Sequence, residues 1–197
     1  MIYIKSFFIK LYLISKGAKI GKKFKCYVFP KIEIIDSFKL NLILGENVII
    51  SGKIEIKQRG NSILKIGNNT KIDQGVRIIV ANESCLNISN NSKIMFYSQI
   101  NCGANVSIGS YTGVSAFGFI TSSLHNHVIE KNYMSTEYTH KEIVIGNNVQ
   151  IGTSCYVSPG SVIEDNLVIA PYSFVSGELK SGYVYQGFPI KKVSLLY

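Results

Sequence analysis

Between residues 145 and 179, an aliphatic residue recurs at every sixth position. The members of this ladder are Ile145, Ile151, Val157, Ile163, Ile169 and Val175. A second set, mostly small or apolar, lies four positions after each of them: Val149, Cys155, Ser161, Leu167, Ser173 and Leu179. A period of six fits neither an α-helix nor a single β-strand. It fits a chain that turns a corner every six residues and points one side chain per side toward a common axis, as a β-helix does.

The same period extends toward the N-terminus in shorter blocks, between which a few extra residues reset the frame. The blocks are Leu44, Ile50 and Ile56; Ile66, Ile72 and Ile78; Ile88, Ile94, Ile100 and Val106; and Ile108, Val114 and Ile120. Aliphatic-glycine phrases followed by asparagine or lysine recur at residues 20–23, 44–47, 66–69 and 145–148. Glycine and asparagine tolerate the positive φ of tight corners. The sequence therefore predicts an all-β fold, a parallel β-helix over residues 20–180.

The ladder is interrupted at length only between Ile120 and Ile143. This polar segment contains all three histidines, His125, His127 and His140. Long excursions from a rigid scaffold are more often functional than accidental. We therefore predict a protruding loop at about residues 121–142 that carries functional side chains.

Basic residues are concentrated at the N-terminus. Residues 1–31 hold eight of the 21 basic residues, all lysines, and none of the 12 acidic residues. Residues 1–16 predict a short amphipathic helix that Gly17 ends. This N-terminal segment, residues 1–19, can dock on the β-helix end, on a partner subunit, or peripherally on an anionic membrane surface. It is too short and too charged to span a membrane. Residues 181–197 are expected to form a C-terminal tail.

Composition argues against several classes of function. The four cysteines form no CxxC pair, and all three histidines lie in one loop rather than on neighbouring coils, so we expect no metal site. The cysteines also imply no disulfide framework, which fits a reducing cytoplasm. Beyond residue 31 the chain carries the other 13 basic residues and all 12 acidic ones. A nearly neutral body offers no groove for nucleic acid.

Residues 94–193 resemble the hexapeptide-repeat acyltransferases, and within them the sugar O-acetyltransferases that act on galactosides and maltose. Three motifs carry the resemblance: His-Asn-His at residues 125–127, Ile-Gly-Asn-Asn-Val-Gln-Ile-Gly at 145–152, and Gly-Phe-Pro-Ile-Lys at 187–191. The last is similar to the closing Gly-x-Pro-Ala-Lys of the family. The resemblance implies a left-handed parallel β-helix, usually a homotrimer, with acetyl-CoA in a groove between neighbouring subunits.

By its place in the motif, His125 resembles the family's catalytic histidine. A histidine titrates near neutral pH and can take the proton of an attacking hydroxyl. His127 is the second candidate, and His140 is a weaker one. The acids that lie near enough in sequence to orient the base are Glu130, Glu137 and Glu142, and a backbone carbonyl would serve equally.

For the acyl donor, the family positions carried over are Thr153, Pro171, Ser176, Gly177 and Lys191. The resemblance implies that Thr153 and the backbone at Pro171 meet the pantetheine arm, and that Lys191 faces the nucleotide phosphates as a point charge. The sequence departs from the family at three places. Residues 176–177 replace a common Thr-Lys pair, Gln150 replaces a frequent tryptophan, and Ile190 replaces the alanine of the closing motif.

The expected function is acetyl transfer from acetyl-CoA to a sugar hydroxyl, within assembly of a bacterial surface polysaccharide such as O-antigen or capsule. The expected setting is the cytoplasm or the inner face of the membrane. N-acetylation of an amino-sugar nucleotide is an alternative, although residues 1–90 show neither a GxGxxG fingerprint nor a βαβ pattern. A non-catalytic β-helix that serves as a scaffold is a third.

Overall fold

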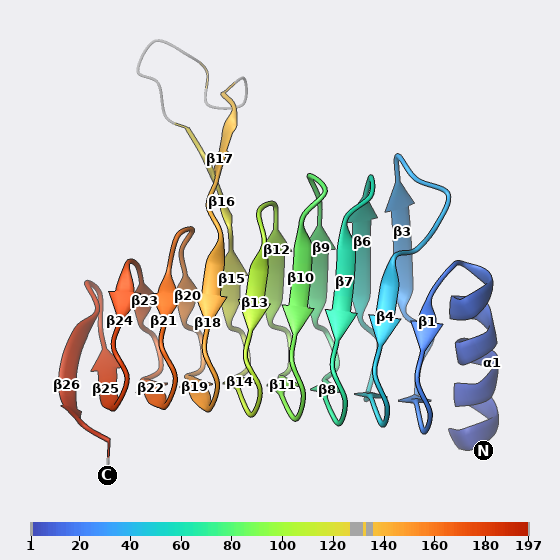
Figure 1. The fold of residues 1–197 in the computed structure, drawn as a ribbon, viewed down its shortest axis with the longest axis horizontal. Coiled ribbons are helices and arrows are strands. Elements are labelled where there is room, and N and C mark those ends of the chain that lie inside the picture. The colour runs from blue at the N-terminus through green and yellow to red at the C-terminus, as the bar shows by residue number, and fades with distance from the viewer. Residues whose placement is uncertain (1, 127–131, 133–135, 197) are drawn as a thin grey trace.

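The computed structural model describes residues 2–126, 132 and 136–196, and these form a parallel β-helix (Figure 1). Three sheets make its three sides. Sheet A contains β1 (Lys19–Ile20), β4 (Leu42–Leu44), β7 (Ile63–Ile66), β10 (Cys85–Ile88), β13 (Val106–Ile108), β18 (Ile143–Ile145), β21 (Val162–Ile163) and β24 (Glu178–Leu179). Sheet B contains β2 (Lys25–Cys26), β5 (Ile49–Ile50), β8 (Lys71–Ile72), β11 (Lys93–Ile94), β14 (Gly113–Val114), β19 (Val149–Ile151), β22 (Leu167–Ile169), β25 (Tyr183–Gln186) and β26 (Lys191–Leu195). Sheet C contains β3 (Lys31–Ile35), β6 (Glu55–Arg59), β9 (Arg77–Val80), β12 (Gln99–Cys102), β15 (Phe119–Thr121), β20 (Tyr156–Val157) and β23 (Phe174–Val175). Every strand pairing within these three sheets is parallel except that of β25 with β26.

The core is a stack of aliphatic rungs along the axis of the solenoid. The predicted ladder from Ile145 to Val175 is confirmed, because its six members and the six residues that follow them by four are all buried. Burial of each large aliphatic side chain contributes about 1.5–3 kcal/mol of transfer free energy. The inward side chains of each coil are buried by the coils stacked on either side. A single coil could not shield its inward side chains from water.

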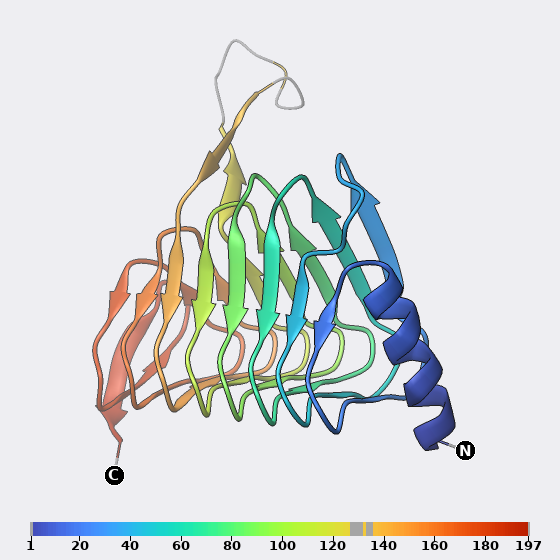
Figure 2. The same cartoon turned by 45° about the vertical axis from the view of Figure 1, so that its right-hand side comes forward.

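The coils shorten from the N-terminus toward the C-terminus, which explains why the sequence ladder resets. On sheet A, Leu44 pairs with Ile66 and Ile66 with Ile88, each 22 residues later. Ile145 pairs with Ile163, 18 residues later. The two coil lengths differ by an even number of residues. The added residues therefore lengthen the strands without turning inward side chains outward. Figure 2 shows the wider coils nearest the N-terminus.

Asparagine ladders stabilise the corners predicted from the glycine phrases. Asn47, Asn69 and Asn148 adopt left-handed φ values of 53–55°, which asparagine tolerates better than most residues. The Asn47 amide donates to Asn69 Oδ1 at 3.0 Å, and the Asn148 amide donates to Asn166 Oδ1 at 2.8 Å. Each corner is therefore bonded to the equivalent corner of the next coil.

The N-terminal end of the stack is covered by α1 (Ile2–Ser15), as Figure 1 shows. The expected helix is thus confirmed, and one face of it docks on the first coil. Ile9 and Leu13 are fully buried. Ser6 Oγ accepts from the Cys26 N–H at 3.0 Å and lies 3.1 Å from the Cys26 carbonyl. These contacts occupy groups that the edge strand β2 would otherwise leave unpaired.

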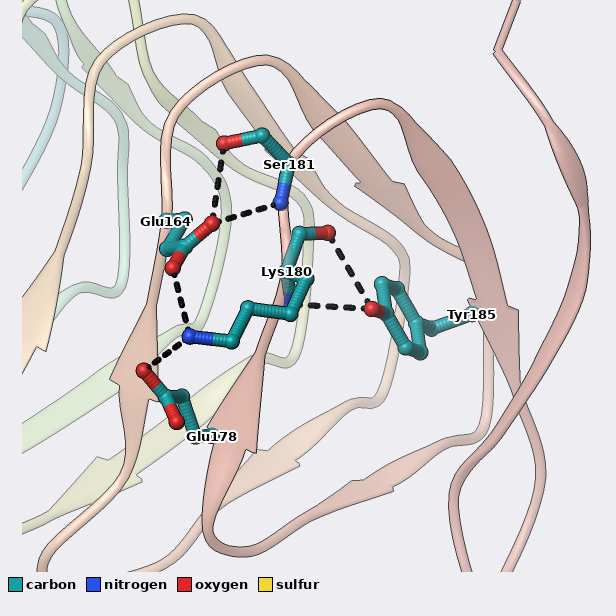
Figure 3. Close-up of polar contacts among 5 residues, drawn as sticks. All are labelled: Glu164, Glu178, Lys180, Ser181 and Tyr185. Carbon is teal, nitrogen blue, oxygen red and sulfur yellow. Dashed lines mark hydrogen bonds and ion pairs between the residues drawn. The ribbon is translucent and has the colours of Figure 1, made fainter.

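The C-terminal end is closed by β25, which pairs with β22 on one side and with β26 on the other. Polar contacts fix this end (Figure 3). Lys180 Nζ lies 2.9 Å from Glu164 Oε1 and 2.5 Å from Glu178 Oε1. The Lys180 N–H donates to the Tyr185 hydroxyl at 2.8 Å. The hydrogen bond from Lys180 holds the pKa of the Glu164 carboxyl below its ordinary value, so this carboxyl is ionised at neutral pH. β25 lies within the expected tail and adds a rung to sheet B.

Candidate functional site

The expected excursion at residues 121–142 leaves the solenoid after β15 and returns at β18. Its described part is an antiparallel hairpin of β16 (Ser123–His125) and β17 (Tyr138–His140), which projects from the side of the stack (Figures 1 and 2). Ser123 lies opposite His140, and His125 lies opposite Tyr138. Directly opposed residues of an antiparallel pair share a face of the ribbon. These four side chains therefore share one face, and Leu124 lies on the other.

The base of the hairpin is bonded to the corner of the preceding coil. Ser122 Oγ accepts from the N–H groups of Gly103 and Ala104, each at 2.9 Å. The Lys141 N–H donates to the Ser122 carbonyl at 2.9 Å. A Cβ atom on Gly103 would collide with Ser123 Oγ and lie 2.8 Å from His140 Nδ1. The hairpin can approach this corner so closely because residue 103 has no side chain.

His140 is held by both of its ring nitrogens. Its Nδ1 lies 2.8 Å from Ser123 Oγ, and its Nε2 lies 3.1 Å from Asn82 Nδ2. The same Asn82 nitrogen donates to the Gly103 carbonyl at 3.2 Å. Because a carbonyl only accepts, this bond fixes the amide nitrogen as the donor. His140 Nε2 is then the acceptor, and Nδ1 carries the proton that is donated to Ser123.

A cavity of about 400 Å³, here called the hairpin hollow, lies between this hairpin face and the outer face of sheet C. Ser123, Tyr138 and His140 line one side of it. Its other side is basic and is lined by Lys57, Arg59 and Arg77. Charge and hydrogen-bonding groups therefore face one another across the same space.

A second cavity of about 460 Å³, here called the lysine hollow, shares Arg77 with the first. It is lined further by Lys31, Lys53 and Glu55. Ion pairs neutralise part of this charge: Lys31 Nζ lies 3.0 Å from Glu55 Oε1, and Arg77 Nε lies 3.5 Å from Glu55 Oε2. Lys53 makes no ion pair with any residue that the structure describes, so the surface keeps a positive excess.

His125 adjoins the hairpin hollow through Tyr138. The His125 and Tyr138 ring centroids are 3.8 Å apart with an angle of 37° between the ring planes. The Tyr138 ring in turn stacks on His140 at 6.0 Å and 13°. Three aromatic rings thus form a row on the hairpin face. The structure places His140, expected to be the weakest of the three histidines, directly in the wall of the hollow.

Some predicted residues fall outside this geometry. His127 and Glu130 lie outside the described residues. Glu142 Oε1 accepts from Asn105 Nδ2 at 2.7 Å. Among described residues, no cluster of three or more His, Cys, Asp or Glu side chains has metal-ligand geometry.

The expected acyl-donor residues lie in two places on the C-terminal coils. Thr153 and Pro171 occupy the same corner of successive coils, and the Tyr172 N–H donates to the Thr153 carbonyl at 2.9 Å. Ser176 and Gly177 lie at the opposite edge of sheet C, between β23 and β24. Lys191 is exposed at the start of β26. The structure therefore brings Thr153 and Pro171 together but does not bring them to residues 176–177.

An aromatic column on sheet C was missed by sequence reasoning. Phe119 lies 5.3 Å from Tyr156, Tyr156 stacks on Phe174 at 5.0 Å and 5°, and Phe174 lies 4.9 Å from Phe188. Burial raises the pKa of the Tyr156 hydroxyl. The available signal was that Phe119, Tyr156 and Phe174 each precede an inward aliphatic residue by one position, which places them outward.

The outward residues of sheet C therefore change in character along the stack. They are charged on β6, Arg77 and Ile79 on β9, polar amides on β12, and aromatic on β15, β20 and β23. The hairpin leaves the solenoid after β15. Its histidines stand at the boundary between a charged surface and an aromatic one.

Comparison with known proteins identifies the repeat and supports the fold. Residues 142–177 match the family described as bacterial transferase hexapeptide (six repeats). A mutant of the N-acyltransferase AntD from Bacillus cereus, in complex with dTDP-4-amino-4,6-dideoxyglucose and coenzyme A, superposes with a TM-score of 0.68 at 16% identity, covering 94% of this chain and 87% of that one. The polySia-specific acetyltransferase NeuO gives 0.65 at 19% identity, covering 91% and 86%. A hexapeptide-repeat acetyltransferase from Vibrio cholerae gives 0.52 at 16% identity, covering 95% and 79%. No curated protein matches the sequence. The expected hexapeptide-repeat β-helix is confirmed.

Proposed function

We propose that this chain, whose residues 142–177 are a hexapeptide repeat of the bacterial transferase type, is an acetyl-CoA-dependent O-acetyltransferase. Its acceptor is a sugar hydroxyl in bacterial surface-polysaccharide assembly, and its general base is His125. One observation carries the proposal. A hairpin that bears histidines rises from sheet C where the outward row changes from charged and amide residues to aromatic ones. At such a boundary, a polar sugar acceptor can bind on one side of the histidines and acetyl-CoA on the other.

The charged side of the boundary supports an acceptor that itself bears negative charge. Arg59 and Arg77 offer planar donors suited to carboxylate or phosphate groups, and both line the hairpin hollow. Ser123 and Asn82 add neutral hydrogen-bonding groups of the kind that hold sugar hydroxyls. NeuO is specific for polySia, and AntD was solved with a dTDP-linked sugar. These two relatives favour acidic sugars or sugar nucleotides as acceptors.

The aromatic side supports binding of the acyl donor. Tyr156 and Phe174 present flat apolar faces that suit the adenine ring or the pantetheine arm of acetyl-CoA. Thr153 and Pro171 lie on the same C-terminal coils, and AntD was solved with coenzyme A. Lys192 Nζ lies 3.5 Å from the centroid of the Tyr183 ring. Because Lys192 is engaged in this way, Lys191 is the lysine proposed to bind the phosphates of acetyl-CoA. Ser176 and Gly177 would contact the donor from the other edge of sheet C.

In the proposed reaction, the protein carries a proton between the two substrates, and acetyl-CoA supplies the activated acyl group. His125 takes the hydroxyl proton while the sugar oxygen forms a bond to the thioester carbonyl carbon. As the carbon–sulfur bond breaks, the His125 imidazolium returns that proton to the thiolate. Atoms and charge balance, and the products are an acetyl ester and free coenzyme A. Proton transfer of this kind contributes about 10²–10⁴-fold in rate. Tyr138 packs against His125 and so orients its ring.

The proposal includes a homotrimer that acts in the cytoplasm, close to the inner face of the membrane. The family resemblance supports the trimer, and the donor groove would then lie between subunits. The free thiols support a reducing compartment, because Cys26, Cys85, Cys102 and Cys155 are all unpaired.

A second candidate is N-acetylation of an amino-sugar nucleotide, which the AntD complex favours. The test is to incubate the protein with acetyl-CoA and three acceptor panels: acidic oligosaccharides, neutral oligosaccharides and amino-sugar nucleotides. Acetylation that mild alkali removes identifies an ester and supports the proposal. An alkali-stable product, formed only with amino sugars, would replace it with the N-acetyl alternative. No product with any panel and no acetyl-CoA binding would leave the scaffold hypothesis.

A further inference from the structure

The outward face of α1 is apolar. The buried residues Ser6, Ile9 and Leu13 define its inner face. At 100° per residue, Phe7, Leu11 and their neighbours point the opposite way. The exposed large apolar side chains on α1 are Tyr3, Ile4, Phe7, Phe8, Leu11, Tyr12 and Ile14. Phe7 and Phe8 are each 58% exposed. The helix is therefore hydrophobic on two sides, although only one of them contacts the protein.

This surface breaks the usual rule for the end of a repeat stack. Terminal units of repeat proteins carry a polar outer face, because nothing stacks on them. The C-terminal end is mixed: Lys180, Glu164 and Glu178 form ion pairs at its surface (Figure 3), while Val193 and Leu195 of β26 are exposed. The α1 end presents a continuous row of large apolar side chains, and Phe29 extends this apolar patch by packing edge-on against Tyr12 at 5.8 Å.

Lysines surround the apolar patch. All charged residues in the first 31 positions are lysines, eight in number. Lys16 Nζ lies 5.9 Å from the Tyr12 ring and Lys25 Nζ 5.7 Å from the Tyr3 ring. Lys5, Lys22 and Lys23 are exposed on the helix and on the coil that it covers. An apolar face with a lysine rim is the pattern of helices that lie in the interface of an anionic bilayer.

We propose that the outward face of α1 docks on an anionic lipid bilayer, with the helix parallel to the membrane surface. Burial of the phenylalanines among lipid chains and attraction between the lysines and acidic headgroups both favour this state. A second copy of the chain is a poorer occupant. End-to-end contact would bring two sets of eight lysines together with no acidic residue in either segment, and like charges repel. No described helix is long and apolar enough to cross a membrane.

Docking in this way places the first coil, and with it the N-terminal end of sheet C, nearest the lipid surface. β3 is the strand of sheet C in the first coil, the coil that α1 covers (Figure 1). Its Lys31 lines the lysine hollow, which continues through Arg77 to the hairpin hollow. A basic path therefore runs from the membrane end of the stack to the histidines. Its use by a membrane-attached acidic glycan rests on the proposed function, whereas bilayer binding does not.

The test is co-sedimentation of the full chain with vesicles, one set of phosphatidylcholine alone and one that also contains phosphatidylglycerol. We expect binding to the anionic vesicles, weakening as salt rises. The double substitution Phe7→Ser with Phe8→Ser should lower the partition coefficient by about tenfold or more. The matched control, Phe96→Ser with Tyr111→Ser, removes two exposed aromatic side chains far from α1 and should bind as the wild type does. Circular dichroism checks that both variants are folded.

Several outcomes would overturn the proposal. One is absence of wild-type binding to anionic vesicles. A second is binding that the Phe7 and Phe8 substitutions leave unchanged. A third is self-association that these substitutions abolish while vesicles capture nothing, which would assign the face to a second copy. Acetyl transfer to a soluble acceptor, measured on the same samples, separates failure of membrane docking from failure of the proposed activity.

Discussion

The coils of the solenoid and the hairpin of β16 and β17 use their side chains in opposite ways. In β9, exposure alternates strictly, with Ile78 and Val80 turned into the core. In β16 and β17 no residue is buried on either face. An isolated two-stranded hairpin is at best marginally stable in water. The coils therefore supply the stability, and the hairpin presents polar and aromatic groups to solvent.

The contacts at the hairpin base show how the two regions are joined. Ser122, Gly103 and Asn82 fix the hairpin to the corners of neighbouring coils. The chemical groups are thus positioned by the scaffold without contributing to its core. A change in the coil should affect folding, whereas a change on the hairpin should affect activity.

The largest expected difference in stability is between Ile151→Ala and Leu124→Ala. Ile151 is fully buried in β19, whereas Leu124 is 49% exposed on the hairpin face away from the histidines. Ile151→Ala should lower the free energy of unfolding by about 2–5 kcal/mol. Leu124→Ala should change it by about 0.5 kcal/mol or less. Urea denaturation followed by circular dichroism measures both, and similar losses would break the comparison.

Two glycines test the join between coil and hairpin. Gly103→Ala forces Ser123 and His140 to move and should cost about 1–3 kcal/mol of stability. The control is Gly113→Ala in β14, where an added Cβ meets nothing within 4 Å. This control should be neutral or stabilise by about 0.4–1 kcal/mol. If thermal unfolding shows Gly103→Ala to be as stable as Gly113→Ala, the hairpin does not approach the corner as described.

The tautomer of His140 offers a smaller but sharper test. Asn82 donates to His140 Nε2, so the wild-type imidazole should carry its proton on Nδ1. Asn82→Asp replaces the donor with an acceptor of similar shape and should move a proton onto Nε2. The stability change should be about 1 kcal/mol. Nitrogen-15 NMR of the imidazole distinguishes the two forms, and an Nε2-protonated wild type would contradict the assignment.

The smallest effects concern the thiols inside the coils. Burial raises the pKa of Cys26 and of Cys102 to about 11 from the ordinary 9.0. Iodoacetamide at pH 8 should therefore label the half-buried Cys85 first. The folded state holds these two thiol protons more tightly than the unfolded state, so stability should decline as pH rises from about 9 to about 11. Equal labelling of Cys85 and Cys102 in the folded protein would show that the coil interior is open.

The features that could be predicted from the sequence are those that each coil repeats. Inward aliphatic residues such as Ile151 and corner asparagines such as Asn148 were recognisable because local geometry places the same demand on every rung. The sequence did not reveal that coils differ in length by an even number of residues. Two extra residues in a strand keep the alternation of inward and outward side chains, but they interrupt the six-residue spacing of the aliphatic ladder.

The site depended on contacts between distant residues. Asn82 and His140 are 58 positions apart, and only the stacking of coils brings them together. His140 was predicted to be the weakest candidate base because it lies far along the chain from His125. The register of the hairpin places both histidines on the same face. The sequence predicted an amphipathic helix at residues 1–16, whereas α1 is apolar on two sides, one docked on the first coil and one exposed.

Release of free coenzyme A from acetyl-CoA is the measurement that tests the central claim most directly. Wild type, His125→Ala and Leu124→Ala are compared with an acidic oligosaccharide acceptor, and thermal unfolding of all three checks the fold. We predict that His125→Ala lowers kcat by about 10²–10⁴-fold without a change in Tm, while Leu124→Ala, on the opposite face of the hairpin, retains the wild-type rate. Wild-type kcat in a folded His125→Ala variant would contradict the account and exclude His125 as the base.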